Sequence, residues 1–239
     1  MKNLLVLVTV YIAVPFSGSA AQICMTDNLA NYIALAAGGC MVGTSTVNNF
    51  STLGLPTGST AIAPSAVTIT PLNMPNSPGL QFGLNVNASG SPQEILFGYN
   101  LSSGSITGAT LTMANATAAG NGTASGLEHL CLGGNFTAGT LTGCSTGPPT
   151  GLATVVVSGF SQGTNQATFA AVSNVRVQDD FVADPGGTGS ASIGTFTNNF
   201  TATGGTTVPE PSTMLLLSAG LCGVGLLRRR VAGRLGSKG

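Results

Sequence analysis

Residues 80–87 have the sequence Leu80-Gln81-Phe82-Gly83-Leu84-Asn85-Val86-Asn87. Its apolar residues alternate with polar residues or glycine. Successive side chains of a β-strand point to opposite faces of the sheet, so this period of two predicts a strand with one buried face and one hydrated face.

The same alternation recurs in other short segments of the chain: Val67 with Ile69, Ile95-Phe97-Tyr99, Ala109-Leu111-Met113, Val155 to Val157, Phe169 with Ala171, Val175 with Val177, and Phe196 with Phe200. Turn-forming residues lie between these segments: Pro71, Pro75, Pro78, Gly90-Ser91-Pro92, Asn121-Gly122, Gly147-Pro148-Pro149 and Asp184-Pro185-Gly186-Gly187. We therefore predict an all-β fold, an antiparallel β-sandwich or jelly-roll-like domain. The 35 glycines could indicate disorder, but the alternation favours a folded domain.

One segment has a helical pattern. In the stretch from Asp27 to Ala37, Asp27 can cap the first amides, Leu29 and Ile33 share a face, and Gly38-Gly39 can end the helix. The sequence predicts a short N-terminal helix here.

The first residues have the features of a secretory signal peptide. Lys2 precedes an apolar run from Leu4 to Val14, and small residues lead to Gln22. We expect a signal helix over residues 1–21 with cleavage after Ala21, and therefore export.

The last part of the chain has the features of a membrane segment. Val208-Pro209-Glu210-Pro211 precedes an uncharged apolar run from Met214 to Leu227, and Arg228-Arg229-Arg230 follow it. The run can form a transmembrane helix, although a relaxed span needs roughly 20 apolar residues. The arginines should remain on the cytoplasmic side, which places the preceding domain outside.

This combination resembles the PEP-CTERM sorting signal of Gram-negative envelope proteins. The stretch Leu29–Leu35 together with Gly39–Gly43 also resembles the start of other PEP-CTERM proteins from soil bacteria. The resemblance implies that exosortase, an integral-membrane enzyme, recognises Val208, Pro209, Glu210 and Pro211 and removes the tail, often in species that secrete exopolysaccharide. A plain single-pass anchor is the alternative.

These features divide the chain into five parts: a signal peptide over 1–21, a β-sandwich domain over 22–200, a linker over 201–207, the sorting signal with its transmembrane helix over 208–230, and a basic cytoplasmic tail over 231–239. The domain is long enough to bury a sizeable core.

The mature domain has very few cations. Arg176 is its one lysine or arginine, against six carboxylates, so it carries five net negative charges. One cation cannot neutralise a row of phosphates, which excludes nucleic-acid binding. Ser, Thr, Asn and Gly must supply most of the hydrated surface.

Cysteine usage agrees with export. Cys24, Cys40, Cys131 and Cys144 lie in the mature domain, and four thiols in an oxidising compartment predict two disulfides. Of three possible connectivities, the local pairing of Cys24 with Cys40 and Cys131 with Cys144 is the simplest. The spacings do not fit a zinc site, and we expect no metal or cofactor.

Candidate catalytic groups are few. Glu128 and the sole histidine, His129, are neighbours, but neighbours on a strand point to opposite faces, so we interpret them as a surface pair. Glu94, Glu128, Asp179, Asp180 and Asp184 could supply the carboxylate pair of a glycosidase, but the chain has no tryptophan for sugar stacking. Asp179, Asp180 and Asp184 could also gather around Ca²⁺, although a strand end followed by a turn is the simpler interpretation.

We therefore expect a non-catalytic envelope or extracellular-matrix protein, inner-membrane anchored during processing and then held at the cell surface or in the matrix. Its expected role is structural or adhesive, in surface or exopolysaccharide biofilm assembly, with exosortase, the membrane and exopolysaccharide as partners. A carbohydrate-binding module is the alternative, and a glycoside-active enzyme is the third hypothesis.

Overall fold

The computed structural model describes residues 22–136, 144, 152–157 and 161–203, all of which belong to one compact unit, Ala21–Thr207. The predicted signal helix and C-terminal transmembrane helix lie outside the described residues. Within those residues, no helix is long and apolar enough to cross a membrane. The elements are β1 (Asp27–Asn28), α1 (Leu29–Ala34), β2 (Cys40–Val42), β3 (Ser45–Thr52), β4 (Thr60–Ala61), the 3-10 helix η1 (Pro64–Ala66), β5 (Thr68–Leu72), β6 (Gly79–Ala88), β7 (Gln93–Ala119), β8 (Thr123–Leu132), β9 (Leu152–Val157), β10 (Ser161–Asp184) and β11 (Ser190–Thr203).

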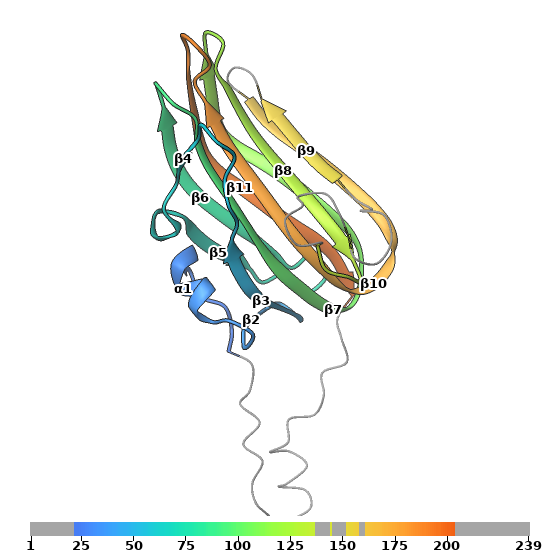
Figure 1. Cartoon of the computed structure of the whole chain (residues 1–239). Coiled ribbons are helices and arrows are strands. Elements are labelled where there is room, and N and C mark those ends of the chain that lie inside the picture. The colour runs from blue at the N-terminus through green and yellow to red at the C-terminus, as the bar shows by residue number, and fades with distance from the viewer. Residues whose placement is uncertain (1–21, 137–143, 145–151, 158–160, 204–239) are drawn as a thin grey trace, which may run out of the picture. The chain divides into compact units, whose positions relative to one another are not determined.

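The fold is all-β and sandwich-like, as predicted. The strands form one sheet in the order β1-β5-β6-β11-β7-β10-β8-β9, with β2, β3 and β4 attached beside β7. Every strand pairing is antiparallel except that of β4 with β7. Figure 1 shows the long strands β7, β10 and β11 running side by side.

The two longest strands contribute to both layers of the sandwich. The first part of β7 pairs with β3 and the second part with β11, while β10 follows β7 along both parts through register shifts between Thr168 and Asn174. One layer therefore contains β3, β8 and β9 together with the first half of β7 and the second half of β10. The other layer contains β5, β6 and β11 together with the second half of β7 and the first half of β10.

Aromatic rings fill the space between the layers. Phe181 on β10 stacks on Phe196 of β11 with ring centroids 3.9 Å apart, and Phe82 on β6 lies 5.0 Å from Phe97 on β7. The opening stretch of the sequence forms β6, whose Leu80, Phe82 and Leu84 are buried, as the alternation predicted. Burial of these side chains is the main stabilising contribution, roughly 1.5 to 3 kcal/mol for each large apolar side chain.

The N-terminal helix is shorter than its sequence pattern indicated. Asp27 belongs to β1, and the helix α1 is capped instead by Asn28, whose side chain accepts a hydrogen bond from the Asn31 amide at 3.0 Å. Pairing of β1 with β5 keeps Asp27 extended and delays the start of the helix. Leu29 and Tyr32 form the buried face of α1.

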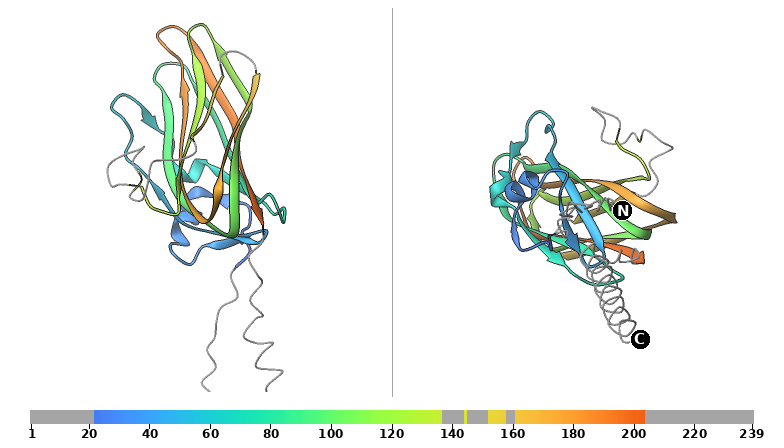
Figure 2. Two further views of the ribbon diagram at one scale, coloured as in Figure 1. Left: turned by 90° about the vertical axis from the view of Figure 1, so that its right-hand side faces the viewer. Right: turned by 90° about the horizontal axis from the view of Figure 1, so that it is seen from below.

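The sandwich has two distinct ends, which Figure 2 shows from the side. At the far end lie the turns between β6 and β7, β7 and β8, and β10 and β11. At the other, the exit end, β11 finishes at Thr203, beside the β2–β3 turn and the loop of residues 73–78. Because β11 extends to Thr203, the strand continues into the segment that we predicted to be linker, which began at residue 201.

Candidate functional site

Two carboxyl groups face each other inside the sandwich. Glu128 on β8 lies directly opposite Asp179 on β10, and both are fully buried. Residues directly opposite in an antiparallel pair project from the same face of the sheet. Asp179 is also paired with Phe97 of β7, whose ring belongs to the aromatic core, so this face is the interior.

Asn198 connects this pair to the other layer. Its side-chain amide on β11 donates to both carboxylate oxygens of Asp179, at 3.0 and 2.8 Å, and to the Tyr99 hydroxyl at 3.2 Å. Both Glu128 oxygens and Asn198 Oδ1 are buried without a hydrogen-bond partner. We call these residues the interior acid cluster: Tyr99, Glu128, Asp179 and Asn198.

Burial changes the acidity of the interior acid cluster. It raises the pKa of Asp179 to about 8, with the Asn198 hydrogen bond acting in the opposite direction and the Asp180 charge adding to the rise. It also raises the pKa of Glu128 well above its usual range, and the neighbouring Asp179 charge adds to that effect. At neutral pH the cluster therefore retains protons, because two adjacent buried carboxylates would be costly.

A second polar group lies on the opposite face of the same strands. Asp180 alternates with Asp179, and burial raises its pKa to about 7, with further contributions from the Glu94 charge and a hydrogen bond to Glu94. Glu94 itself is buried, as is Gln178, which pairs with His129 across β10 and β8. Burial also lowers the pKa of His129. We call this group the outer polar cluster: Glu94, His129, Gln178 and Asp180.

The two clusters test our interpretation of the Glu128–His129 pair. The two side chains do project from opposite faces, as the strand geometry predicted, with Glu128 opposite Asp179 and His129 opposite Gln178. The expectation of a surface pair is wrong, because both residues are buried. Strand β8 is covered on both faces at this point, which the local alternation could not reveal.

The three aspartates do not converge on one site. Asp179 projects inward and Asp180 outward from the last part of β10, and both are still paired with β8, so they precede the strand end at Asp184. Asp184 does precede a turn, where its carboxylate accepts a hydrogen bond from the Gly186 amide at 2.8 Å. Among the described residues, no three His, Cys, Asp or Glu side chains gather as a metal site would require.

The domain's one cation lies apart from the interior acid cluster. The Arg176 guanidinium donates to the Asn49 carbonyl at 3.1 Å, to Asn100 Oδ1 at 3.0 Å and to Ser51 Oγ at 3.3 Å. Arg176 is opposite Cys131 in the β10–β8 register and so alternates with Val175 and Val177 of the core. Arg176 therefore cannot neutralise the buried carboxyl groups of Glu128 and Asp179 by pairing with them.

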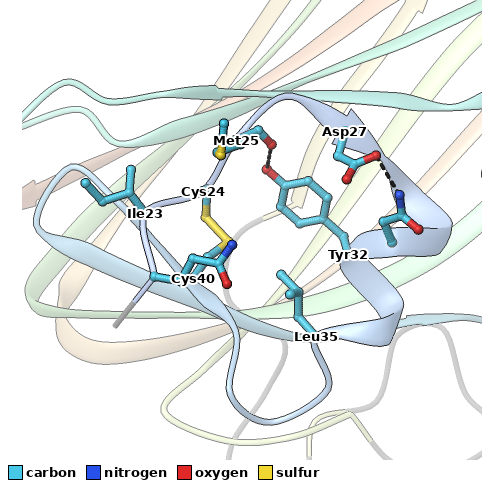
Figure 3. Close-up of a pocket in the computed structure, with 9 residues that line it drawn as sticks. Ile23, Cys24, Met25, Asp27, Tyr32, Leu35 and Cys40 are labelled. Atoms are coloured by element: carbon cyan, nitrogen blue, oxygen red, sulfur yellow. Dashed lines mark hydrogen bonds between the residues drawn. A yellow bond between two sulfur atoms is a disulfide. The ribbon is translucent and has the colours of Figure 1, made fainter. Parts of the chain in front are cut away.

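A small depression lies at the N-terminal edge of the sandwich, with a volume of about 90 Å³. Figure 3 shows its lining around the Cys24–Cys40 disulfide, with Tyr32 donating to the Met25 carbonyl at 2.7 Å. Asp27 is its one carboxylate, and that group accepts hydrogen bonds from the Asn28 amide and the Asn31 side chain. Burial and the Asp27 charge raise the Tyr32 pKa to about 12, so the phenol stays protonated.

The predicted disulfides are present. Cys24 bonds to Cys40 and Cys131 bonds to Cys144, which is the local connectivity. The predicted sorting residues, Val208, Pro209, Glu210 and Pro211, and the arginines Arg228, Arg229 and Arg230 lie outside the described residues.

Sequence reasoning missed two members of the interior acid cluster, Tyr99 and Asn198. Asn198 stands between Phe196 and Phe200 at a spacing of two, so the alternation already placed it on the buried face of β11. An amide in such a position needs a buried partner. That requirement was the available signal for a polar group in the core.

The fold is thus a disulfide-bonded all-β domain in which two of the six carboxyl groups, those of Glu128 and Asp179, face each other in the packed interior. Residues 207–230 match the family model of the PEP-CTERM protein-sorting motif. The chain therefore carries a PEP-CTERM sorting signal, and that signal implies export and membrane-anchored processing by exosortase.

Two other comparisons add little. No curated protein gives a match to this chain. A solved structure, the enzymatically active domain of the bacteriophage CBA120 tailspike protein 4, is similar over 66% of this chain and 19% of that chain, at 13% identity and a TM-score of 0.28. The match thus covers about a fifth of the tailspike chain.

Proposed function

We propose that the mature domain is a non-catalytic structural or adhesive protein of the cell surface or extracellular matrix, with a role in exopolysaccharide biofilm assembly. The observation that carries this proposal is the location of the acidic groups. Glu94, Glu128 and Asp179 are buried in paired strands, and none of them lines the depression beside the Cys24–Cys40 disulfide.

The small depression does not favour catalysis either. General acid–base chemistry needs a titratable group within hydrogen-bond reach of the reacting atom. At about 90 Å³ the depression is well below the roughly 300 to 1,000 Å³ of ordinary ligand pockets, and its one carboxylate, Asp27, already accepts two hydrogen bonds. These features support a non-enzymatic role.

Buried aromatic rings weigh against the carbohydrate-binding alternative. Sugar-binding surfaces usually present exposed rings. Among the described residues, Phe136 and Phe169 are partly exposed, whereas the other rings are buried: Tyr32, Phe50, Phe82, Phe97, Tyr99, Phe181, Phe196 and Phe200. The exposed side chains of the strands are mainly hydroxyls and amides, such as those of Thr112 and Thr164, which hydrogen bond to each other across β7 and β10 at 3.2 Å. Such a surface can hydrate well among polysaccharides without a specific sugar site.

Two measurements test the proposal. Cells with and without an exosortase gene are fractionated, and we expect loss of the tail from the mature protein only when the gene is present. A glycan array is then probed with residues 22–207. We expect no selective saturable binding, and such binding would replace the structural role with a lectin function.

A further inference from the structure

Large apolar side chains are exposed at one end of the sandwich. Among the described residues, the exposed large hydrophobic side chains are Ile23, Met25 and Met74, at 66%, 71% and 48% exposure. Exposed apolar residues scattered singly need no explanation, but their gathering in one region indicates contact with a partner or a membrane.

Backbone contacts place Ile23 at the exit end. Ile23 forms a bridge with Met41, and Met41 pairs with Thr46 in the β2–β3 hairpin. Thr46 pairs with Ser102 of β7. The next residue, Ser103, donates its hydroxyl to the carbonyl of Thr203 at 3.4 Å.

Met74 belongs to the same end through the loop of residues 73–78. Gly43 of the β2–β3 turn donates its amide to the Asn73 side chain at 3.1 Å. In the same loop, the Asn76 carbonyl accepts a hydrogen bond from the Ala202 amide at 3.2 Å. Met25 is near Ile23 and lines the same depression, which Figure 3 shows. All three side chains therefore lie around the point where β11 ends.

Chain length limits how far the exit end can lie from the membrane. Residues 204–213 separate Thr203 from the apolar run that begins at Met214, and ten residues span at most about 35 Å. Strand β11, Ser190–Thr203, is about 45 Å long at the usual rise per residue. A tail held in the bilayer therefore keeps the exit end within about 35 Å of the lipid.

We propose that the exit end, through Ile23, Met25 and Met74, contacts the lipid bilayer while the chain is anchored by its C-terminal segment. This inference depends on the membrane anchoring that the proposed function assumes, but not on any adhesive role. Apolar side chains that enter the boundary between headgroups and acyl chains bury apolar surface, which favours membrane binding. The contact would hold the domain upright on the membrane before processing.

Charge identifies the kind of lipid surface. The domain's one cation, Arg176, is hydrogen bonded to Asn49, Ser51 and Asn100, and the exposed carboxylate Asp27 lies beside Met25. Without basic residues there is no attraction to anionic headgroups. The contact is therefore apolar, independent of salt and no stronger on anionic than on neutral lipid.

Single tryptophans provide the test, because the chain contains none. The anchored chain without its signal peptide, residues 22–239, is reconstituted in neutral-lipid vesicles as Met25→Trp, Met74→Trp and the control Ser89→Trp. Ser89 is exposed at the far end, next to Ala88, which pairs with Ala191. Brominated lipids quench tryptophans that touch the acyl region, and we expect about half or more of the fluorescence to be lost at residues 25 and 74, with little loss at residue 89.

Equal quenching at all three positions would overturn the inference, as would an absence of quenching at residues 25 and 74 in vesicles that carry the protein through flotation. If the anchored chain fails to float with the vesicles, the C-terminal segment does not anchor it, and the inference fails as well. Flotation thus separates failure of the anchor from failure of the contact. Repeating the measurement with anionic vesicles should give no greater quenching, and a marked increase there would contradict the apolar mechanism.

Discussion

Glu128 and Asp179 face each other across β8 and β10, fully buried, and the Asn198 amide is the hydrogen-bond donor that reaches Asp179 from the opposite layer. Two acids without a neighbouring cation can remain in a core only if protonation relieves their charge. The free energy of unfolding should therefore depend on pH in a direction opposite to that of proteins stabilised by ion pairs.

Stability should decrease as pH rises. Asp179 has a pKa near 4 in the unfolded chain and about 8 in the folded domain, so over that interval the folded state binds more protons. The contribution of Asp179 to the free energy of unfolding is therefore greatest below pH 4 and falls as pH approaches 8, whereas the lowered pKa of His129 acts in the opposite direction. Urea denaturation of the mature domain at pH 4, 6 and 8 measures this dependence, and greater stability at pH 8 than at pH 4 would contradict it.

The variant Glu128→Gln is the matched control for that dependence. It keeps the shape of the side chain and removes the carboxyl group of Glu128, whose pKa is raised by burial. We expect a shallower decline with pH and higher stability than wild type at pH 8. An unchanged slope would mean that Glu128 does not contribute to the pH dependence.

Removal of the Asn198 side chain should destabilise the domain. Asn198→Ala leaves Asp179 without its amide donor and opens a cavity between the layers, at a cost of about 1 to 3 kcal/mol. Chemical denaturation measures the loss. Asn87→Ala, at an exposed position of β6, is the control and should change stability by less than about 0.5 kcal/mol.

Gly126 should not tolerate a larger residue. A Cβ atom added there would overlap the Phe196 ring, which stacks on Phe181. Gly126→Ala should therefore cost about 1 to 3 kcal/mol through overpacking. Gly90→Ala provides the comparison, since nothing lies within 4 Å of its Cβ position, and equal melting temperatures for the two variants would disprove the steric explanation.

The Cys24–Cys40 disulfide should stabilise the N-terminal edge. It closes a loop of 16 residues between Cys24 and Cys40. Closing a loop of this length stabilises the folded domain by about 3 kcal/mol, because it lowers the entropy of the unfolded chain. Cys24→Ser with Cys40→Ser should lower the free energy of unfolding by that amount. The measurement is urea denaturation under oxidising conditions, and unchanged stability would contradict this role.

The alternating strands were predictable because burial on one face leaves a direct pattern in the sequence. Leu80, Phe82 and Leu84 show it, and their positions in β6 agree. The length of β7 was not predictable, because its apolar segments at Ile95–Tyr99 and Ala109–Met113 look like two separate strands. Only tertiary pairing with β3 and β11 shows that they are parts of one strand.

The interior acid cluster was outside the reach of local reasoning for a similar reason. Glu128 and Asp179 are distant in the chain, and the register of β8 against β10 brings them together. A surface carboxylate is the default expectation for any acidic residue, since its burial alone is costly. The hydrogen-bond partners of Asn198 lie on other strands, so only the packing of the two layers brings them within reach.

Residue type and local order are enough to predict the all-β class, the disulfide content, the near absence of cations and the sorting signal. The tertiary structure decided which strands bend between layers, which acids are buried together, and that Ile23, Met25 and Met74 gather where β11 ends. These relationships join residues far apart in the chain. They are set by strand register and by the packing of one layer on the other, which local patterns do not encode.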